Sequence, residues 1–199
     1  MSQATTIDLL RHGTPVGGRR YRGQIDDPLS EEGWAEMWAA VNGARPWRQI
    51  VCSPLSRCRQ FAEALGDRLA LPVAEDPRLR EVGFGDWEGH STDELRQRDP
   101  ELITRFYCDP VRNRPSGAEP LDAFSARVNT AIGDILQRHQ GQHTLVVTHA
   151  GVIRAALTHV LQAPLGSMYR MSVATASISR IRSDGERPPT VLFHGRTRL

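Results

Sequence analysis

Lysine is absent from the 199-residue sequence, and all 25 basic residues are arginine. A chain without lysine cannot use a lysine Schiff base or the phosphate-binding lysine of a Walker A loop. Arginine suits a different task, because its planar guanidinium group can hold two phosphate or carboxylate oxygens at once. The formal net charge of +2 is too small to indicate binding to nucleic acid or to an anionic membrane.

Cysteine is also scarce, and its spacing indicates no site. Cys52, Cys58 and Cys108 form neither an even disulfide set nor a usual zinc-binding pattern. No other cluster has metal-ligand spacing, so we expect no metal and no other cofactor. No apolar run reaches membrane-spanning length, and the first residues lack the features of a signal peptide. The sequence therefore predicts a cytoplasmic protein that does not associate with membranes.

The length and the alternation of patterns predict one α/β domain over residues 1–199. Short β-prone runs predict strands at 5–10, 49–53, 143–148, 173–181 and 190–194, and helical periodicity predicts helices at 30–41, 54–69, 121–139 and 152–161. We expect a three-layer sandwich with a mostly parallel central sheet, helices on both faces and room for an antiparallel strand at one edge. The Gly-, Pro- and charge-rich stretch at about 83–120 predicts a partly irregular excursion over the active site.

Histidine and arginine residues follow three of the predicted strands. In open α/β sheets, ligands bind outside the carboxyl ends of the strands. The segments at these ends read Leu10-Arg11-His12-Gly13-Thr14, Cys52-Ser53-Pro54-Leu55-Ser56-Arg57 and Thr148-His149-Ala150-Gly151. Each has an ordinary interpretation alone, as a surface arginine or a half-buried histidine. Two histidines and two arginines at one edge together indicate an anion-binding site.

A carboxylate is the fourth candidate. Apolar and glycine residues surround Glu81, a setting that would keep its carboxyl group protonated and able to donate a proton. An ordinary loop carboxylate is the alternative interpretation, and Asp86 and Glu88 compete with Glu81 for the same role.

These four segments, in this order, resemble the motifs of the histidine phosphatase superfamily, which is also called the phosphoglycerate-mutase-like family. The matching residues are Arg11-His12-Gly13, Ser53-Pro54-Leu55-Ser56-Arg57, Leu79-Arg80-Glu81 with Phe84-Gly85-Asp86-Trp87-Glu88-Gly89, and Val147-Thr148-His149-Ala150-Gly151-Val152-Ile153-Arg154. The resemblance spans nearly the whole chain. It implies the α/β fold of that superfamily and a metal-free phosphomonoester hydrolase.

The resemblance also implies a role for each matching residue. His12 would attack phosphorus and carry the phosphoryl group, while Glu81 would protonate the leaving group. Arg11, Arg57 and His149 would bind the phosphoryl oxygens. The full set expected to bind substrate is Arg11, Gly23, Arg57, Glu81, His149 and Ala150.

Some positions depart from the superfamily pattern. Members often have Glu-Thr after Arg-His-Gly, followed by an asparagine that contacts phosphate, whereas this chain has Thr14, Pro15 and Gly18. Cys58 and Phe61 stand where alanine and threonine are common. These changes leave the catalytic set intact and leave the accessory phosphate contacts open.

Within the superfamily, the loops at 17–23, 84–88 and 115–119 are most similar to those of the α-ribazole phosphatases of cobalamin assembly. The implied substrate is α-ribazole 5′-phosphate or its cobalamin-linked form. Phe84 and Trp87 could offer an aromatic surface to the base, although packing in the core is the alternative for both.

Other functions stay open. A broad-specificity or sugar-phosphate phosphatase is the main alternative, while a phosphoglycerate mutase fits less well because the lysine-containing segment of mutases is missing. A phosphate-binding protein without catalysis is the alternative outside the enzymes. The expected partner is a small phosphorylated molecule, with a phosphorylated protein as the alternative, and the oligomeric state is not determined by the sequence.

Overall fold

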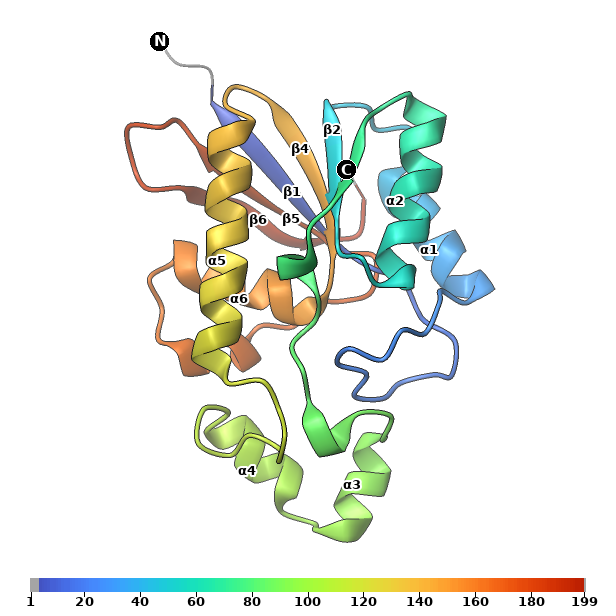
Figure 1. The fold of residues 1–199 in the computed structure, drawn as a ribbon, viewed down its shortest axis with the longest axis vertical. Coiled ribbons are helices and arrows are strands. Elements are labelled where there is room, and N and C mark those ends of the chain that lie inside the picture. Colours follow the sequence, from blue (N-terminus) through green and yellow to red (C-terminus); the bar gives the residue numbers. More distant parts are fainter. Residues whose placement is uncertain (1–3, 199) are drawn as a thin grey trace.

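The computed structural model describes residues 4–198, and a six-stranded sheet of order β3-β2-β4-β1-β5-β6 forms its centre (Figure 1). The strands are β1 (Thr5–Arg11), β2 (Gln49–Cys52), β3 (Val73–Glu75), β4 (His143–Thr148), β5 (Ile178–Ser183) and β6 (Thr190–Arg196). The strands from β3 to β1 in this order are parallel, while β5 and β6 are antiparallel to their neighbours. The expected mostly parallel sheet is confirmed, with two antiparallel strands at one edge.

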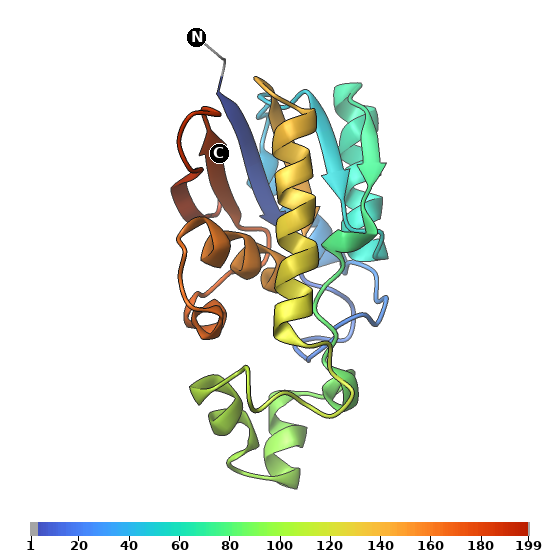
Figure 2. The ribbon, with the colours of Figure 1, turned by 60° about the vertical axis from the view of Figure 1, so that its left-hand side comes forward.

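Helices cover both faces of the sheet, as Figures 1 and 2 show. The four long helices are α1 (Glu31–Val41), α2 (Ser56–Leu69), α5 (Leu121–Arg138) and α6 (Ala150–Val160). Because side chains alternate along a strand, β1 sends Leu10 into the core under α1 and α2. It sends Ile7 and Leu9 into the other core, under α5 and α6. The three-layer architecture therefore follows from two-residue periodicity in strands that are buried on both faces.

The structure differs from the sequence prediction at several elements; among them, two begin at other residues, and one strand was not predicted. The strand predicted at 173–181 begins only at Ile178, because Ala176 has a left-handed φ of 51° and Ser177 closes a turn onto Ala174. The helix α6 begins at Ala150, immediately after the candidate His149, and not at Val152. The strand β3 has three residues, too few for a periodic signal.

The excursion at 83–120 contains a 3₁₀ turn at Gly85–Trp87 and two short helices, α3 (Thr92–Arg98) and α4 (Leu102–Cys108). Figures 1 and 2 show these helices beyond the carboxyl ends of the parallel strands. Aromatic contacts attach them to the rest of the molecule, with ring centroids 5.1 Å apart for Trp87 and Phe106 and 4.7 Å apart for Phe106 and Tyr169. Trp87 is buried in this cluster, so it packs in the core and offers no surface to a substrate.

A buried carboxylate joins the strands on the face covered by α1 and α2. Asp8 of β1 accepts hydrogen bonds from Trp47 Nε1 at 2.9 Å, from His143 of β4 at 3.0 Å and from Arg180 of β5 at 2.7 Å. Burial raises the pKa of Asp8, but the hydrogen bonds from His143, Arg180 and Trp47 together outweigh it and hold the pKa below its usual value. The carboxylate therefore stays charged and satisfied inside the sheet.

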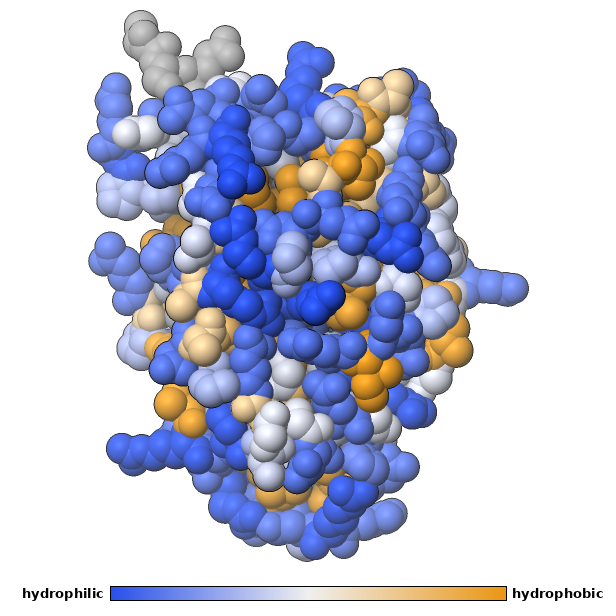
Figure 3. Space-filling view, viewed as in Figure 1, coloured by the Kyte–Doolittle hydropathy of each residue, from blue (hydrophilic) through white to orange (hydrophobic). Residues whose placement is uncertain are grey.

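The surface shown in Figure 3 is mainly hydrophilic over α5 and the segment after β3. Ion pairs cover this region, including Arg78 with Asp76 and with Asp134, both at 2.7 Å. Within residues 4–198, no helix is both long enough and apolar enough to span a membrane.

Candidate active site

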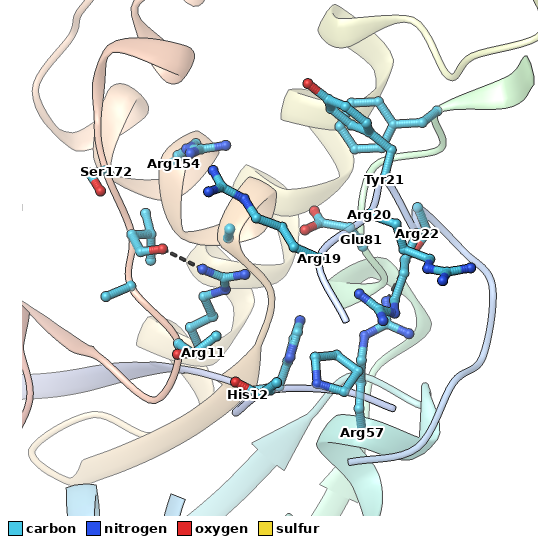
Figure 4. Close-up of a pocket in the computed structure, with 18 of the residues that line it drawn as sticks. Arg11, His12, Arg19, Arg20, Tyr21, Arg22, Arg57, Glu81, Arg154 and Ser172 are labelled. Carbon is cyan, nitrogen blue, oxygen red and sulfur yellow. Dashed lines mark hydrogen bonds between the residues drawn. The ribbon is translucent and has the colours of Figure 1, made fainter. Parts of the chain in front are cut away.

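A cavity of about 550 Å³ opens where β1, β2 and β4 end (Figure 4). The residues predicted from the sequence that line it are Arg11, His12, Gly23, Arg57, Glu81 and Ala150. They come from segments that lie far apart in the chain. The parallel strand ends bring most of them together, as the topology rule predicts.

His12 lies at the floor of the cavity between Arg11 and Arg57 (Figure 4). Its Nδ1 is 2.7 Å from the carbonyl oxygen of Gly13. A carbonyl can only accept a hydrogen bond, so Nδ1 carries the proton and donates it. The neutral ring then keeps its lone pair on Nε2, where it can attack an electrophile.

Two glycines fix the loop that carries His12. A Cβ atom at Gly13 would lie 2.2 Å from the carbonyl oxygen of Gly33, and one at Gly33 would lie 2.1 Å from that of Thr14. The loop after β1 therefore packs directly on the backbone of α1. Thr14 is also held by Glu36 of α1, which accepts from the Thr14 backbone N–H at 2.7 Å. Thr14, where members of the superfamily often have glutamate, is thus tied to α1.

The two arginines beside His12 are anchored by backbone carbonyl groups and not by carboxylates. Arg57 donates to the carbonyls of Ile25 at 2.7 Å and Gly23 at 3.0 Å, and Arg11 donates to that of Val173 at 2.5 Å (Figure 4). The Nε atoms of Arg11 and Arg57 are buried without a hydrogen-bond partner among residues 4–198. Two guanidinium groups that line the cavity without acidic partners form a site for a phosphoryl group.

Burial holds the pKa of His12 well below its usual range, and the charges of Arg11 and Arg57 lower it further. The pKa of Arg11 itself is lowered by burial, while the charge of Glu81 opposes that shift. At neutral pH the site therefore combines an uncharged imidazole with positive charge on both sides. This combination suits nucleophilic attack on a phosphate dianion.

Glu81 reaches the cavity from the segment after β3. Its Oε1 accepts from the backbone N–H of Val82 at 2.9 Å, and its Oε2 accepts from that of Gly151 at 3.2 Å. A Cβ atom at Gly151 would lie 2.2 Å from Oε1, so only glycine allows this approach. The surroundings are thus more polar than the sequence pattern predicts, because the first turn of α6 supplies an N–H group.

The two carboxylates that compete with Glu81 on sequence lie elsewhere. Glu88 accepts from the backbone N–H groups of Phe84 at 2.9 Å and Gln24 at 3.2 Å, which ties the excursion to the loop after β1. Asp86 is exposed, and neither residue lines the cavity. Among the three candidates, the structure places Glu81 where a leaving group can reach it.

His149 does not line the cavity. Its ring is wholly buried behind that of His12, with the two centroids 5.2 Å apart in a T-shaped contact. The Nε2 atom of His149 lies 2.7 Å from Ser53 Oγ, and Cys58 Sγ lies 3.6 Å from the same nitrogen. Burial and the charge of Arg57 hold the pKa of His149 well below its usual range. The ring is therefore a neutral support behind His12.

Sequence reasoning missed several residues of the cavity wall. They include Tyr107, Arg154, Tyr169 and Thr175. Arg154 had a signal, since it stands five residues after His149 at the start of a helix. Tyr107 and Tyr169 had none, because the packing of α4 and of the segment after α6 decides their position. Among residues 4–198, no group of three or more metal-binding side chains is placed to hold an ion.

Comparisons with known proteins agree with this geometry. The model of the histidine phosphatase superfamily, branch 1, matches residues 7–195. A bifunctional protein of Mycobacterium tuberculosis is 36% identical over 189 residues, which cover 91% of this chain, and the chain spans about half (51%) of that relative. The mycobacterial glucosyl-3-phosphoglycerate phosphatase has a TM-score of 0.86 at 26% identity, covering 97% of this chain and 99% of its own. The α-ribazole phosphatase of Shigella flexneri has a TM-score of 0.81 at 27% identity, covering 98% of each chain.

The pKa of His12 is lowered well below 6.5, the usual pKa of histidine. We therefore expect His12 to be still neutral at pH 6.5 and to gain its second proton only in more acidic solution. A ¹⁵N NMR titration of the ligand-free protein should show Nδ1 protonated at pH 7, and the His12→Ala variant assigns the signal. Arg57→Gln removes one neighbouring charge and should raise the midpoint. A wild-type midpoint at or above 6.5 would contradict this account.

Proposed function

The chain belongs to the histidine phosphatase superfamily, and on that basis we propose that it hydrolyses phosphomonoesters through a phosphohistidine on His12. The observation that supports the proposal is the pair of guanidinium groups, held by carbonyl groups and not by carboxylates, on either side of a neutral imidazole in the cavity. Arg11 and Arg57 supply the positive charge that a metal ion supplies in other phosphatases, so the reaction needs no metal.

In the first step, Nε2 of His12 attacks phosphorus as the bond from phosphorus to the ester oxygen breaks. Arg11 and Arg57 hold the phosphoryl oxygens and neutralise their charge. Glu81, protonated beside the bound dianion, gives its proton to the departing alkoxide, which leaves as an alcohol. The phosphoryl group is then on His12, and Glu81 is a carboxylate.

In the second step, water attacks the phosphohistidine from the side that the alcohol has left. Glu81 accepts a proton from this water as the oxygen bonds to phosphorus, and the bond from phosphorus to Nε2 breaks. Inorganic phosphate leaves, and His12 is again neutral with its proton on Nδ1. The hydrogen bond to Gly13 holds the same tautomer throughout.

His149 supports the His12 ring in this proposal. A direct contact between His149 and phosphate, which the resemblance implies, requires its Nε2 to leave Ser53. Ala150 and Gly23 line the cavity, and their part in binding is to shape its floor.

On the level of substrate, the loop resemblance favours α-ribazole 5′-phosphate or its cobalamin-linked form, with a sugar phosphate as the alternative. Trp87 gives this hypothesis no support, because it is buried in the core. Phe84 does support it, since it lines the cavity together with Tyr21, Tyr107 and Tyr169. The likeness to the α-ribazole phosphatase of Shigella flexneri also supports it, although the glucosyl-3-phosphoglycerate phosphatase is at least as similar in fold.

The His12→Ala variant is expected to lose at least about a thousandfold in kcat, since it lacks the group that forms the covalent intermediate. With a ³²P-labelled substrate and EDTA present, quenching of the wild-type reaction should leave acid-labile, base-stable label on the protein. The variant should carry none. Full activity in the variant would overturn the phosphohistidine, and loss of labelling with EDTA would overturn metal independence.

Glu81→Gln and Gly151→Ala should impair the same step. The first variant removes the proton donor, and the second places a methyl group 2.2 Å from Glu81 Oε1. Both should slow an alkyl phosphate far more than p-nitrophenyl phosphate, whose leaving group departs without a proton. Gly133→Ala in α5 is a matched control, because its Cβ meets no atom within 4 Å. Equal losses on both substrates would give Glu81 another role.

If the aromatic wall binds the base, kcat/KM for α-ribazole 5′-phosphate should exceed that for ribose 5-phosphate by at least about tenfold, which corresponds to about 1.4 kcal/mol. Tyr107→Ala should reduce this ratio, whereas Val111→Ala, on an exposed residue that does not line the cavity, should not. Equal values of kcat/KM for the two esters would show that the protein does not recognise the base.

A further inference from the structure

Six arginines line the cavity: four of them form two pairs, while Arg20 and Arg22 donate to backbone carbonyl groups. Arg11 and Arg57 flank His12 at the floor, and Arg19 and Arg154 lie across from them. Figure 4 shows the Arg19 side chain reaching over the cavity toward the wall that carries Arg154. The first pair is enough to bind a phosphate dianion, so the second pair needs a separate explanation.

Arg154 is held in a defined orientation. Its Nε donates to the carbonyl oxygen of Met171 at 3.0 Å, and its Cζ lies 5.3 Å from the ring centroid of Tyr169. Both contacts fix the plane of the guanidinium group and leave its two terminal nitrogens for a ligand. Such an oriented fork matches the paired oxygens of a carboxylate or a phosphate.

Neither Arg154 nor Arg19 is paired with an acidic side chain among residues 4–198. Arg22, which also lines the cavity, differs because Asp27 lies 2.9 Å away and satisfies it. Among the described residues that line the cavity, Glu81 is the only carboxylate. A bound phosphate dianion together with Glu81 therefore leaves part of the positive charge unbalanced.

The charges of Arg154 and Arg19 also act on Arg11. Burial lowers the pKa of Arg11, and both neighbouring guanidinium groups lower it further. The ligand-free cavity thus keeps like charges within range of one another. An anion between Arg154 and Arg19 would offset the charges of these two groups directly.

We propose that Arg154 and Arg19 form a second anion-binding site, so that the substrate is a phosphomonoester carrying another anionic group, either a carboxylate or a second phosphate. The proposal rests on the phosphatase function above. It also ranks the candidate substrates, because free α-ribazole 5′-phosphate has no second acidic group and leaves this site empty. Tyr21 and Tyr169 line the cavity as well and can contact the uncharged part of such a substrate.

Two pairs of substrates test the site, each differing in the second anion. The first pair is 3-phosphoglycerate and glycerol 3-phosphate, in which a carboxylate is replaced by a hydroxymethyl group. The second is fructose 1,6-bisphosphate and fructose 6-phosphate. In the wild-type protein we expect kcat/KM to favour the doubly anionic member of at least one pair by about tenfold or more. The preferred pair identifies the anion as a carboxylate or a phosphate.

Substitutions test whether Arg154 and Arg19 cause the preference for doubly anionic substrates. Arg154→Gln and Arg19→Gln should each bring the ratio of kcat/KM values toward one, and Arg154→Lys should keep part of it because the charge remains without the planar fork. Arg112→Gln is the control for net charge, since this arginine is 88% exposed and does not line the cavity, and its ratio should equal that of the wild type. Arg19 is exposed, so its variant decides the matter if Arg154→Gln does not fold.

Two results would overturn the proposal while the phosphatase function stands. One is a wild-type protein that hydrolyses p-nitrophenyl phosphate but treats both members of each pair alike. The other is a preference that survives unchanged in Arg154→Gln and Arg19→Gln. If p-nitrophenyl phosphate and all four esters are left intact, the phosphatase function itself fails, and the second anion site fails with it.

Discussion

An uncharged imidazole between two guanidinium groups is the arrangement on which the rest of the site depends. In the proposed reaction, His12 can attack phosphorus only while its Nε2 lone pair is free, and burial beside positive charge keeps it free. The same positive charge would attract the phosphate. Acidic partners for Arg11 and Arg57 would cancel that charge. The protein holds them instead by the carbonyl groups of Val173, Gly23 and Ile25.

This solution has an energetic cost, because buried guanidinium groups with unsatisfied Nε atoms destabilise the ligand-free protein. Close packing at two glycines fixes the groups around the site. The loop after β1 lies against α1 at Gly33, and Glu81 lies against the start of α6 at Gly151. Both approaches are too close for any side chain. Small residues at these points let the backbone itself orient the nucleophile and the proton donor.

Two parts of the fold form the cavity, namely the ends of the strands and the loops around them. Arg11, His12 and Arg57 come from the strand ends or the start of the following helix, so their positions follow from the topology of the sheet. The wall opposite comes from the excursion at 83–120, from the loop at 17–23 and from the segment around Tyr169. Loops vary more readily than the strands that carry them, so one phosphohistidine mechanism can serve many substrates. Of the second pair of arginines, Arg19 lies in the variable loop at 17–23, and Arg154 lies in the first turns of α6.

The sequence alone was enough for the fold class, the central strands and several of the residues that line the cavity, because these depend on local patterns. Two-residue and helical periodicity predict the layers, and parallel strands must end at one edge, which brings Arg11, His12 and Arg57 together. Only the tertiary structure separated Glu81 from Asp86 and Glu88, placed Trp87 in the core and set His149 behind His12. It also brought Arg19, Tyr107 and Arg154 to one cavity. These outcomes depend on contacts between segments far apart in the chain, and no local pattern records which side chains such contacts bury and which they leave facing a ligand.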